Sequence, residues 1–280
     1  MRVAVTGGSG KLGRAVVSGL RDAGHDTFVL DSVGTRGDHF TRIDLTNYGS
    51  VADAFGSVND RYPSLDAVVH LAAIPAGGIE TDSATFHNNL TATFNVFQAA
   101  RRAGIKRIVY ASSETLLGIP FEIDPPYLPV DEDYPSRPES MYSVVKHLEE
   151  ELATKLCRWD TDLSITGLRF SNVLDADDYA NQPDWEADPA LRRWNVWGYI
   201  DTRDGAQAVT RALEARLPGF ETFVIANADT VVSVPSSELA AKYFPGVRLT
   251  RELVGNETML SIEKAKRMLG FAPTHSWRAE

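Results

Sequence analysis

The stretch RVAVTGGSGKLG occupies residues 2–13 and joins a β-branched, apolar run directly to a glycine-rich turn. Gly8, Gly10 and Gly13 satisfy the pattern G-x-G-x-x-G. In that pattern glycine permits a tight turn, close approach of the backbone to a pyrophosphate, and packing of the next helix on the strand. The first helical turn then directs free N–H groups and its positive dipole end at the phosphates. Since strand, turn and helix follow in the required order, the stretch predicts a dinucleotide-binding site.

An acidic residue, Asp31, closes the second predicted strand eighteen residues after Gly13. This is close to the spacing at which a carboxylate binds an adenosine ribose. Its negative charge would face the 2′-phosphate of NADP, so NAD is the expected cofactor. Arg36 is near enough in sequence to weaken this preference for NAD over NADP. The alternative interpretation is an ordinary strand–turn–helix followed by an incidental loop aspartate.

The first part of the chain alternates short apolar runs with helical stretches. The expected strands are 2–6, 27–31, 41–45, 65–71 and 107–112, and the expected helices are 11–23, 48–58 and 83–103. Continuous apolar strands, each followed by a helix, indicate a parallel sheet covered on both faces. With right-handed crossovers, they predict a doubly wound α/β fold of the Rossmann type.

The pattern changes after residue 113. Residues 119–138 contain six prolines, a helix is expected over 141–159 and a strand over 163–168, and residues 175–204 are acidic and rich in tryptophan. Helices at 205–216, 236–243 and 261–269 and a strand at 222–226 complete the chain. We therefore expect a dinucleotide-binding domain over 1–168 and a small mixed substrate cap over 169–280, with elements returning to the core.

Composition narrows the classes of function. Of the 280 residues 43% are hydrophobic and 24% charged, as in globular proteins. The net charge of −10 argues against nucleic acid as a partner. No apolar run is long enough to span a bilayer and no leader opens the chain, so no membrane association is expected. A single cysteine, Cys157, excludes an internal disulfide and favours a reducing, cytoplasmic setting, and the scattered histidines predict no catalytic metal.

A tyrosine and a lysine four residues apart, Tyr142 and Lys146, begin the helix predicted at 141–159 and share one face. A phenol titrates near 10, so a base at neutral pH requires about 4 kcal/mol of preferential stabilisation of the phenolate. The lysine ammonium and an oxidised nicotinamide could supply that stabilisation together. Ser112 and Ser113 end a strand at the edge where ligands bind in such sheets.

These motifs together resemble those of the extended short-chain dehydrogenase/reductases, also called the NAD-dependent epimerase/dehydratase family. The segments that carry the resemblance are Thr6–Gly13, Asp31, Asp44–Leu45, His70–Ala73, Asn89, Ala111–Ser113, Tyr142, Lys146 and Leu168–Asn172. The resemblance covers nearly the whole chain. It also implies a homodimer formed through the helices that contain Asn89 and Tyr142.

The resemblance implies a role for each matching residue. Ser113 would orient the substrate, Tyr142 would act as acid and base, and Lys146 would hold the nicotinamide ribose. The expected cofactor-binding residues are Gly7, Gly10, Lys11, Leu12, Gly13, Asp31, Asp44, Leu45, Leu71, Ala72, Ala73, Asn89, Tyr142 and Lys146. The expected substrate-binding residues are Ser112, Ser113, Glu114, Asn172, Arg192 and Trp197.

Two features depart from the family pattern. Glu114 follows the serine pair, where many members have a small residue, and would either bind substrate hydroxyls or cap a turn. The chain is also shorter than most nucleotide-sugar epimerases and looks more like the compact uronate dehydrogenase-type subgroup.

Several other residues have two interpretations or a structural one. The tryptophans around Arg192 and Arg193 would either fasten a loop to the cap or form a lid in which Trp197 stacks on a sugar and an arginine meets an anion. Glu149–Glu151 is expected to be a solvated helix face. Asp204 is expected to cap a helix beginning at Gly205.

The function that we expect is NAD-dependent hydride transfer at a hydroxyl-bearing carbon of a sugar or sugar acid. One alternative is a nucleotide-sugar epimerase or dehydratase with tightly bound NAD, because the same residues serve both chemistries. A non-catalytic NAD-sensing module is the third hypothesis, and the presence of both Tyr142 and Lys146 argues against it.

Overall fold

Seven parallel strands form the central sheet, in the order β3–β2–β1–β4–β5–β7–β10. The computed structural model describes residues 1–279 except 36, 38, 62 and 63, so Arg36 lies outside the described residues. The strands are β1 (Arg2–Thr6), β2 (Asp26–Asp31), β3 (Phe40–Arg42), β4 (Ala67–His70), β5 (Arg107–Ser113), β7 (Ser164–Phe170) and β10 (Gly219–Ile225). This order and direction confirm the predicted doubly wound α/β fold.

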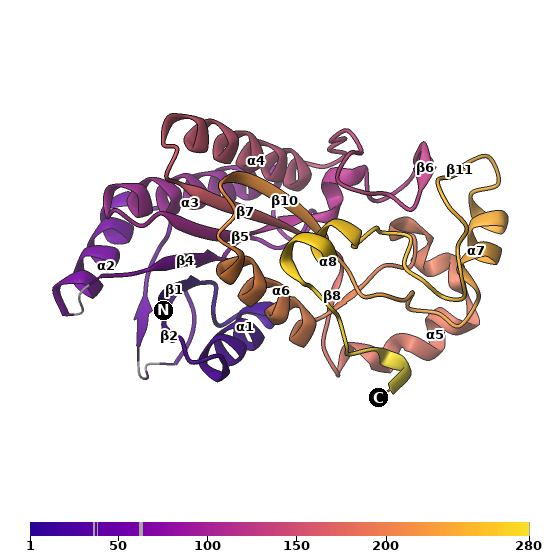
Figure 1. Ribbon diagram of the computed structural model, residues 1–280, viewed down its shortest axis with the longest axis horizontal. Coiled ribbons are helices and arrows are strands. Elements are labelled where there is room, and N and C mark those ends of the chain that lie inside the picture. The colour runs from indigo at the N-terminus through magenta and orange to yellow at the C-terminus, as the bar shows by residue number, and fades with distance from the viewer. Residues whose placement is uncertain (36, 38, 62–63, 280) are drawn as a thin grey trace.

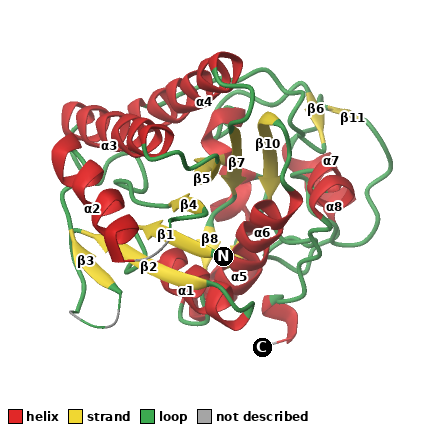
Figure 2. Ribbon diagram, turned by 60° about the vertical axis from the view of Figure 1, so that its left-hand side comes forward, coloured by secondary structure: helices red, strands yellow, loops and turns green. Residues whose placement is uncertain are grey.

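Helices cover both faces of the sheet (Figures 1 and 2). One layer contains α2 (Tyr48–Arg61), α3 (Asp82–Arg102) and α4 (Met141–Trp159), and the other contains α1 (Lys11–Asp22), α6 (Thr202–Ala215) and α8 (Glu263–Leu269). Val3, Ala4 and Val5 of β1 are fully buried, as expected of a strand between two helical layers. Val16 and Leu20 place the apolar stripe of α1 on that sheet.

The direction of the winding reverses at β1, which pairs with β2 on one side and β4 on the other. The chain after β1 builds the sheet outward through β2 and β3, then crosses back to β4 and builds the opposite half. At such a reversal the loops that leave two neighbouring strands diverge, which opens a crevice at their carboxyl ends. Gly7 follows β1 and Leu71 follows β4, so these residues flank the crevice.

The smaller elements lie beyond the carboxyl ends of the sheet, on the right of Figure 1. They are β6 (Tyr127–Leu128), β8 (Val173–Leu174), β9 (Ile200–Asp201), β11 (Arg248–Leu249), α5 (Gln182–Ala187) and α7 (Ser236–Tyr243). From the same half of the sequence, β10 completes the sheet and α6 lies against α1. A division at residue 169 is therefore a proposal about function, since the central sheet extends across it. Within the described part of the chain, no helix combines the length and the apolar character needed to cross a bilayer.

Helix α6 begins three residues earlier than predicted, and its N-cap is Asp201 rather than Asp204. The Asp201 carboxylate accepts a 2.8 Å hydrogen bond from the Arg203 backbone N–H, and its own backbone is extended. Asp204 instead accepts backbone N–H groups of Thr274 and His275. The predicted cap was wrong because Asp204 binds a segment seventy residues away, a contact that local spacing does not reveal.

Candidate active site

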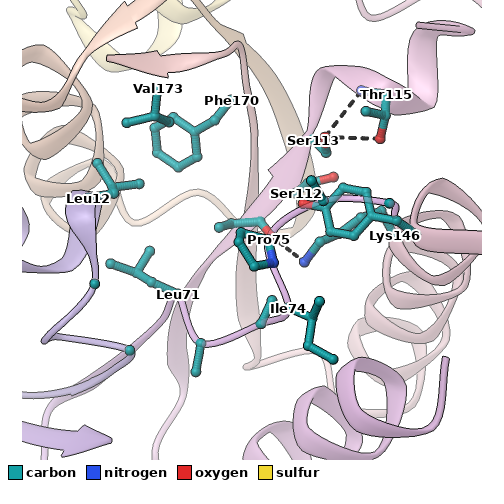
Figure 3. A pocket seen from close by; sticks show the side chains of 18 of the residues that line it. Leu12, Leu71, Ile74, Pro75, Ser112, Ser113, Thr115, Lys146, Phe170 and Val173 are labelled. Atoms are coloured by element: carbon teal, nitrogen blue, oxygen red, sulfur yellow. Dashed lines mark hydrogen bonds between the residues drawn. The ribbon is translucent and has the colours of Figure 1, made fainter. Parts of the chain in front are cut away.

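A continuous cleft of about 1370 Å³ follows the carboxyl ends of the strands from β2 to β7. Figure 3 shows Ser112, Ser113 and Lys146 close together on one side, with Leu12 and Phe170 across the cleft from them. The cleft therefore joins the glycine turn to the predicted catalytic residues, which come from distant parts of the sequence.

The glycine turn has no space for side chains at two positions. Gly7 has a φ of +72°, and a Cβ there would lie 2.6 Å from the backbone nitrogen of Ala72. A Cβ on Gly13 would overlap the carbonyl oxygen of Gly7. Both glycines thus bring α1 and the loop after β4 close to the crevice, which leaves the first turn of α1 facing the cleft.

Two charged residues flank this turn. The Asp31 carboxylate accepts the Ser9 backbone N–H at 2.9 Å, which ties the end of β2 to the turn. Lys11, which lines the cleft, forms an ion pair with Asp178. Asp31 is buried yet lines the cleft, so its remaining acceptor sites are available for ribose hydroxyls.

All but one of the predicted cofactor-binding residues line the cleft. Those that do are Gly7, Gly10, Lys11, Leu12, Gly13, Asp31, Asp44, Leu45, Leu71, Ala72, Ala73, Tyr142 and Lys146.

Asn89 differs from its predicted position. Its side chain is buried, and both ends of its amide bind the backbone of Ile74. The amide oxygen accepts the Ile74 N–H at 2.8 Å, and the amide nitrogen donates to the Ile74 carbonyl at 3.0 Å. The neighbouring Asn88 lines the cleft instead. Asn89 therefore holds the loop after β4 in place and does not face the cleft itself.

Tyr142 lies in the first turn of α4, which a reciprocal cap holds. The Ser140 hydroxyl accepts the Ser143 backbone N–H, and the Ser143 hydroxyl accepts the Ser140 backbone N–H. This places the phenol near the positive end of the helix dipole, which favours a phenolate.

Burial raises the pKa of Tyr142 above its ordinary value in the chain alone, while the Lys146 ammonium and the Ser113 hydroxyl act to lower it. The expected base at neutral pH therefore needs a further positive charge beside the phenol. An oxidised nicotinamide is a group of that kind.

Lys146 is held from two directions. Its ammonium donates to the Ala111 carbonyl at 2.8 Å and to Glu149 at 2.9 Å. Burial acts to lower the pKa of Lys146, but the charge and hydrogen bond of Glu149, together with the charges of Tyr142 and Glu150, outweigh it. The pKa is therefore raised and the ammonium stays charged. The cation lies 5.8 Å from the centre of the Tyr142 ring.

The Ser113 hydroxyl has its acceptor sites occupied by a residue that the sequence analysis missed, Thr115. Both the backbone N–H and the hydroxyl of Thr115 donate to Ser113 Oγ, at 3.2 and 3.0 Å. The proton of Ser113 is consequently directed elsewhere, toward Tyr142 or a substrate oxygen. A threonine two residues after a strand-end serine was the available signal.

Glu149 and Glu150 are buried, so the prediction of a solvated helix face was wrong for both. Glu150 forms a bidentate ion pair with Arg169 and accepts the Ser112 hydroxyl at 2.7 Å. Ser112 lines the cleft, but its proton is used in this contact. Only Glu151 is exposed, paired with Lys155.

A hydrogen-bonded chain leads from Glu149 back to the glycine turn. Thr93 donates to Glu149 at 2.7 Å, His70 contacts Thr93 at 2.9 Å, and Thr6 contacts the other nitrogen of His70 at 2.7 Å. Burial and the charge of Lys146 lower the pKa of His70 to about 3, so the imidazole is neutral. This hydrogen-bonded chain links Lys146, through Glu149, to the last residue of β1.

Glu114 lies on the cleft wall and is buried. Its carboxyl accepts the Ser171 hydroxyl at 2.5 Å and the Asn195 amide at 3.3 Å, and burial raises its pKa to about 7. The short 3₁₀ turn Glu114–Leu117 is capped by Ser113 rather than Glu114. Of the two interpretations of Glu114, a cap of this turn is therefore excluded.

The tryptophan-rich segment fastens a loop. Trp197 is fully buried, donates its indole N–H to the Pro189 carbonyl and lies against Tyr243 and Phe244, so it does not line the cleft. A lid in which Trp197 stacks on a sugar is excluded by this burial.

Arg192 is likewise buried and outside the cleft wall. Its guanidinium donates to Asn172 at 2.8 Å and to the Gly198 carbonyl at 2.9 Å, between the rings of Trp185 and Trp194. Asn172 and Trp194 are the residues that reach the cleft.

The cleft suits a dinucleotide by its own geometry: a turn that excludes Cβ atoms, a helix N-terminus and a carboxylate at the end of β2 lie in sequence along it. Within the described ranges no group of three His, Cys, Asp or Glu side chains could hold a metal ion. The fold and cleft thus define a dinucleotide-dependent α/β enzyme.

Comparison with known proteins assigns this class to a family. The sequence model of the NAD dependent epimerase/dehydratase family matches residues 3–226. The chain belongs to that family, and it is an NAD-dependent enzyme of the extended short-chain dehydrogenase/reductase type.

The relatives include enzymes of two activities. The chain is 30% identical over 255 residues to an L-arabinose 1-dehydrogenase (NAD(P)(+)) of Haloferax volcanii, covering 87% of this chain and 96% of that protein. It is 30% identical over 191 residues to the UDP-glucose 4-epimerase of Bacillus subtilis, covering 63% of this chain and 54% of the epimerase. The match therefore spans about half the length of that epimerase.

A solved structure of a mutated uronate dehydrogenase is also similar. It has a TM-score of 0.67 and 22% identity, with 99% of this chain and 83% of the other covered. At this identity the similarity shows the fold.

Proposed function

We propose that the protein oxidises a hydroxyl-bearing carbon of a sugar with NAD as hydride acceptor. The observation that carries this proposal is the meeting of Ser113, Tyr142 and Lys146 in one cleft with the glycine turn. The dehydrogenase relative, aligned over nearly its whole length, supports the same chemistry.

Each side chain has a defined part in this reaction. When bound, oxidised nicotinamide would supply the hydride acceptor and a positive charge. Tyr142 takes the hydroxyl proton of the substrate as the carbon gives up its hydride and becomes a carbonyl. Ser113 donates its proton as a hydrogen bond to the reacting oxygen, while Thr115 keeps the serine rotamer fixed. Lys146 stabilises the phenolate and is available to ribose hydroxyls.

The second candidate function is epimerisation of a nucleotide sugar, which the Bacillus subtilis relative favours. The same Tyr142 and Ser113 would then serve an oxidation followed by reduction from the opposite face. The two candidates differ in the fate of the cofactor: a dehydrogenase exchanges it at every turnover, and an epimerase retains it.

The test is a steady-state assay of NADH formation with NAD and a panel of aldoses, uronates and nucleotide sugars. Our proposal expects NADH to accumulate with at least one free sugar, and freely exchanging cofactor in the purified protein. Turnover of a nucleotide sugar without net NADH, with cofactor retained through purification, would replace it by the epimerase.

The cellular compartment and the oligomeric state are also proposals. The single cysteine, Cys157, is buried and its thiol pKa is raised to about 11 by burial, which suits a structural residue in a reducing, cytoplasmic compartment. We propose a homodimer through α3 and α4, where Phe94 of α3 is 47% exposed. Mass measurement by light scattering tests it, and a monomer at micromolar concentration would exclude it.

A further inference from the structure

The end of the cleft beside Tyr142, where a substrate must lie if the proposed function holds, has no cationic side chain among its lining residues. We call it the substrate end and define it by the lining residues Ser113, Glu114, Thr115, Ile119, Pro120, Glu139, Ser140, Ser171, Asn172 and Trp194. It contains hydroxyl, amide and carboxyl groups and one indole, and none of these ten side chains is cationic. Across the whole described cleft wall the cations are Lys11 and Lys146.

Both lysines bind other groups of the protein, away from the substrate end. Lys146 is buried and bound by Glu149 and the Ala111 carbonyl. Lys11 lies at the glycine turn and pairs with Asp178.

The arginines near the substrate end also bind other groups of the protein. Arg137 pairs with Glu139 at 2.7 Å, and Arg193 pairs with Asp124 at 2.6 Å. Arg192 is held by Asn172 and the Gly198 carbonyl behind the cleft wall. Each of these arginines thus already has a carboxylate, amide or carbonyl partner, and none of the three lines the cleft.

The carboxyl of Glu114 also discriminates between neutral and anionic substrates. It is fixed in the wall by Ser171 and Asn195, so it cannot turn away from a bound ligand. Above about pH 7, where this carboxyl is ionised, a substrate carboxylate or phosphate beside it would lose its hydration without gaining a partner, whereas a sugar hydroxyl can donate to it.

We infer that the substrate is an uncharged free sugar, selected over a uronate or a nucleotide sugar by the fixed carboxyl of Glu114 and a substrate end without a cation. The inference rests on the proposed function and names its substrate class. Hydroxyls of the sugar would meet Ser113, Thr115 and the Asn172 amide, and its C–H face would meet the Trp194 ring.

The experiment is run at about pH 8, where the Glu114 carboxyl is ionised, and compares matched pairs that differ at one carbon, galactose with galacturonate and glucose with glucuronate, together with UDP-galactose. The value of kcat/KM should favour the neutral member by at least about tenfold. Glu114→Gln should narrow this ratio by raising the uronate value relative to the sugar, and Glu122→Gln, exposed and outside the cleft, should leave it unchanged. A preference for the uronate or UDP-galactose, or an unchanged ratio in Glu114→Gln, would overturn the inference.

A binding measurement separates this inference from the proposed function. Tyr142→Phe loaded with NAD is titrated with galactose and with galacturonate, and Trp194 on the cleft wall provides a fluorescence signal. Tighter binding of the neutral sugar supports the substrate class even if no NADH forms in the wild type, a result that would reject only the oxidation. Equal or tighter binding of the uronate, or binding of neither, contradicts the substrate class. The proposed oxidation is then tested separately, by the assay of NADH formation.

Discussion

The ammonium of Lys146 donates a 2.9 Å hydrogen bond to the carboxylate of Glu149, three residues later on α4, and both side chains are buried. The pair sets the charge near Tyr142, because Lys146 lowers the pKa of that phenol and Glu149 raises it. Through Thr93 and His70 it also reaches Thr6 at the glycine turn. We therefore expect Glu149 to be a positioning residue that acts through Lys146.

We expect Glu149→Gln to shift the acid limb of the kcat/KM profile to lower pH. Removing the carboxylate leaves the Lys146 charge less compensated, so the pKa of Tyr142 falls. The free energy of unfolding should also fall, by about 3 kcal/mol, because a buried cation loses its anionic partner. The measurements are a pH–rate series and urea unfolding.

Glu151→Gln is the matched control, since Glu151 is exposed on the same helix and pairs only with Lys155 among the described residues. It should leave both measurements unchanged. A Glu149→Gln profile that overlays the wild type would show that Glu149 has no influence on the catalytic phenol.

A second prediction concerns Glu114 and the pH dependence of stability. Burial raises its folded pKa from the ordinary 4.5 to about 7. Between pH 4.5 and about pH 7 the folded chain keeps a proton on Glu114 that the unfolded chain releases. The contribution of Glu114 to the free energy of unfolding therefore falls as the pH rises through this range, and it is constant above about pH 7. The stability difference, Glu114→Gln minus wild type, should therefore be larger at about pH 8 than at about pH 4, by up to about 3 kcal/mol.

Urea unfolding at both pH values measures this difference, with Glu122→Gln as the exposed control. If the difference for Glu114→Gln is the same at both pH values, Glu114 ionises normally and the argument for a desolvated carboxyl is incorrect.

The elements of the sheet were predictable because their signals are local. The apolar run of β1, the glycines after it and the helix of Lys11–Asp22 lie within twenty-two residues. The same holds for Tyr142 and Lys146, one turn apart on one helix. Motifs of this kind need only neighbours in sequence.

The errors share a different cause. Glu150 looks solvated in sequence because its partner Arg169 comes from β7, and Asp204 looks like a cap because its partners are Thr274 and His275. Trp197 was expected among the substrate-binding residues because no local pattern shows that it is covered by Phe244. Buried polar groups and aromatic side chains are satisfied by contacts made only on folding, so spacing alone cannot identify them.

A third prediction concerns Asp31. Replacing it with alanine should raise the KM for NAD about tenfold, equivalent to about 1.4 kcal/mol, because a carboxylate that can accept ribose hydroxyls is lost. The preference for NAD over NADP should narrow as well, since the negative charge facing a 2′-phosphate is removed. Initial-rate kinetics with both cofactors measure the two effects.

Asp26→Ala, at the exposed start of the same strand, is the control and should change neither value. An Asp31→Ala enzyme with the wild-type KM for NAD would remove the ribose role.

The most direct test of the account is NADH formation by Tyr142→Phe. This variant keeps the ring and the cleft but lacks the group that accepts the substrate proton, so we expect kcat to fall by about 10²–10⁴-fold with the affinity for NAD unchanged by calorimetry. Tyr243→Phe, outside the cleft, should retain full activity. A Tyr142→Phe enzyme that oxidises the sugar at the wild-type rate, with NAD bound normally, would contradict the central claim that this phenol exchanges the proton.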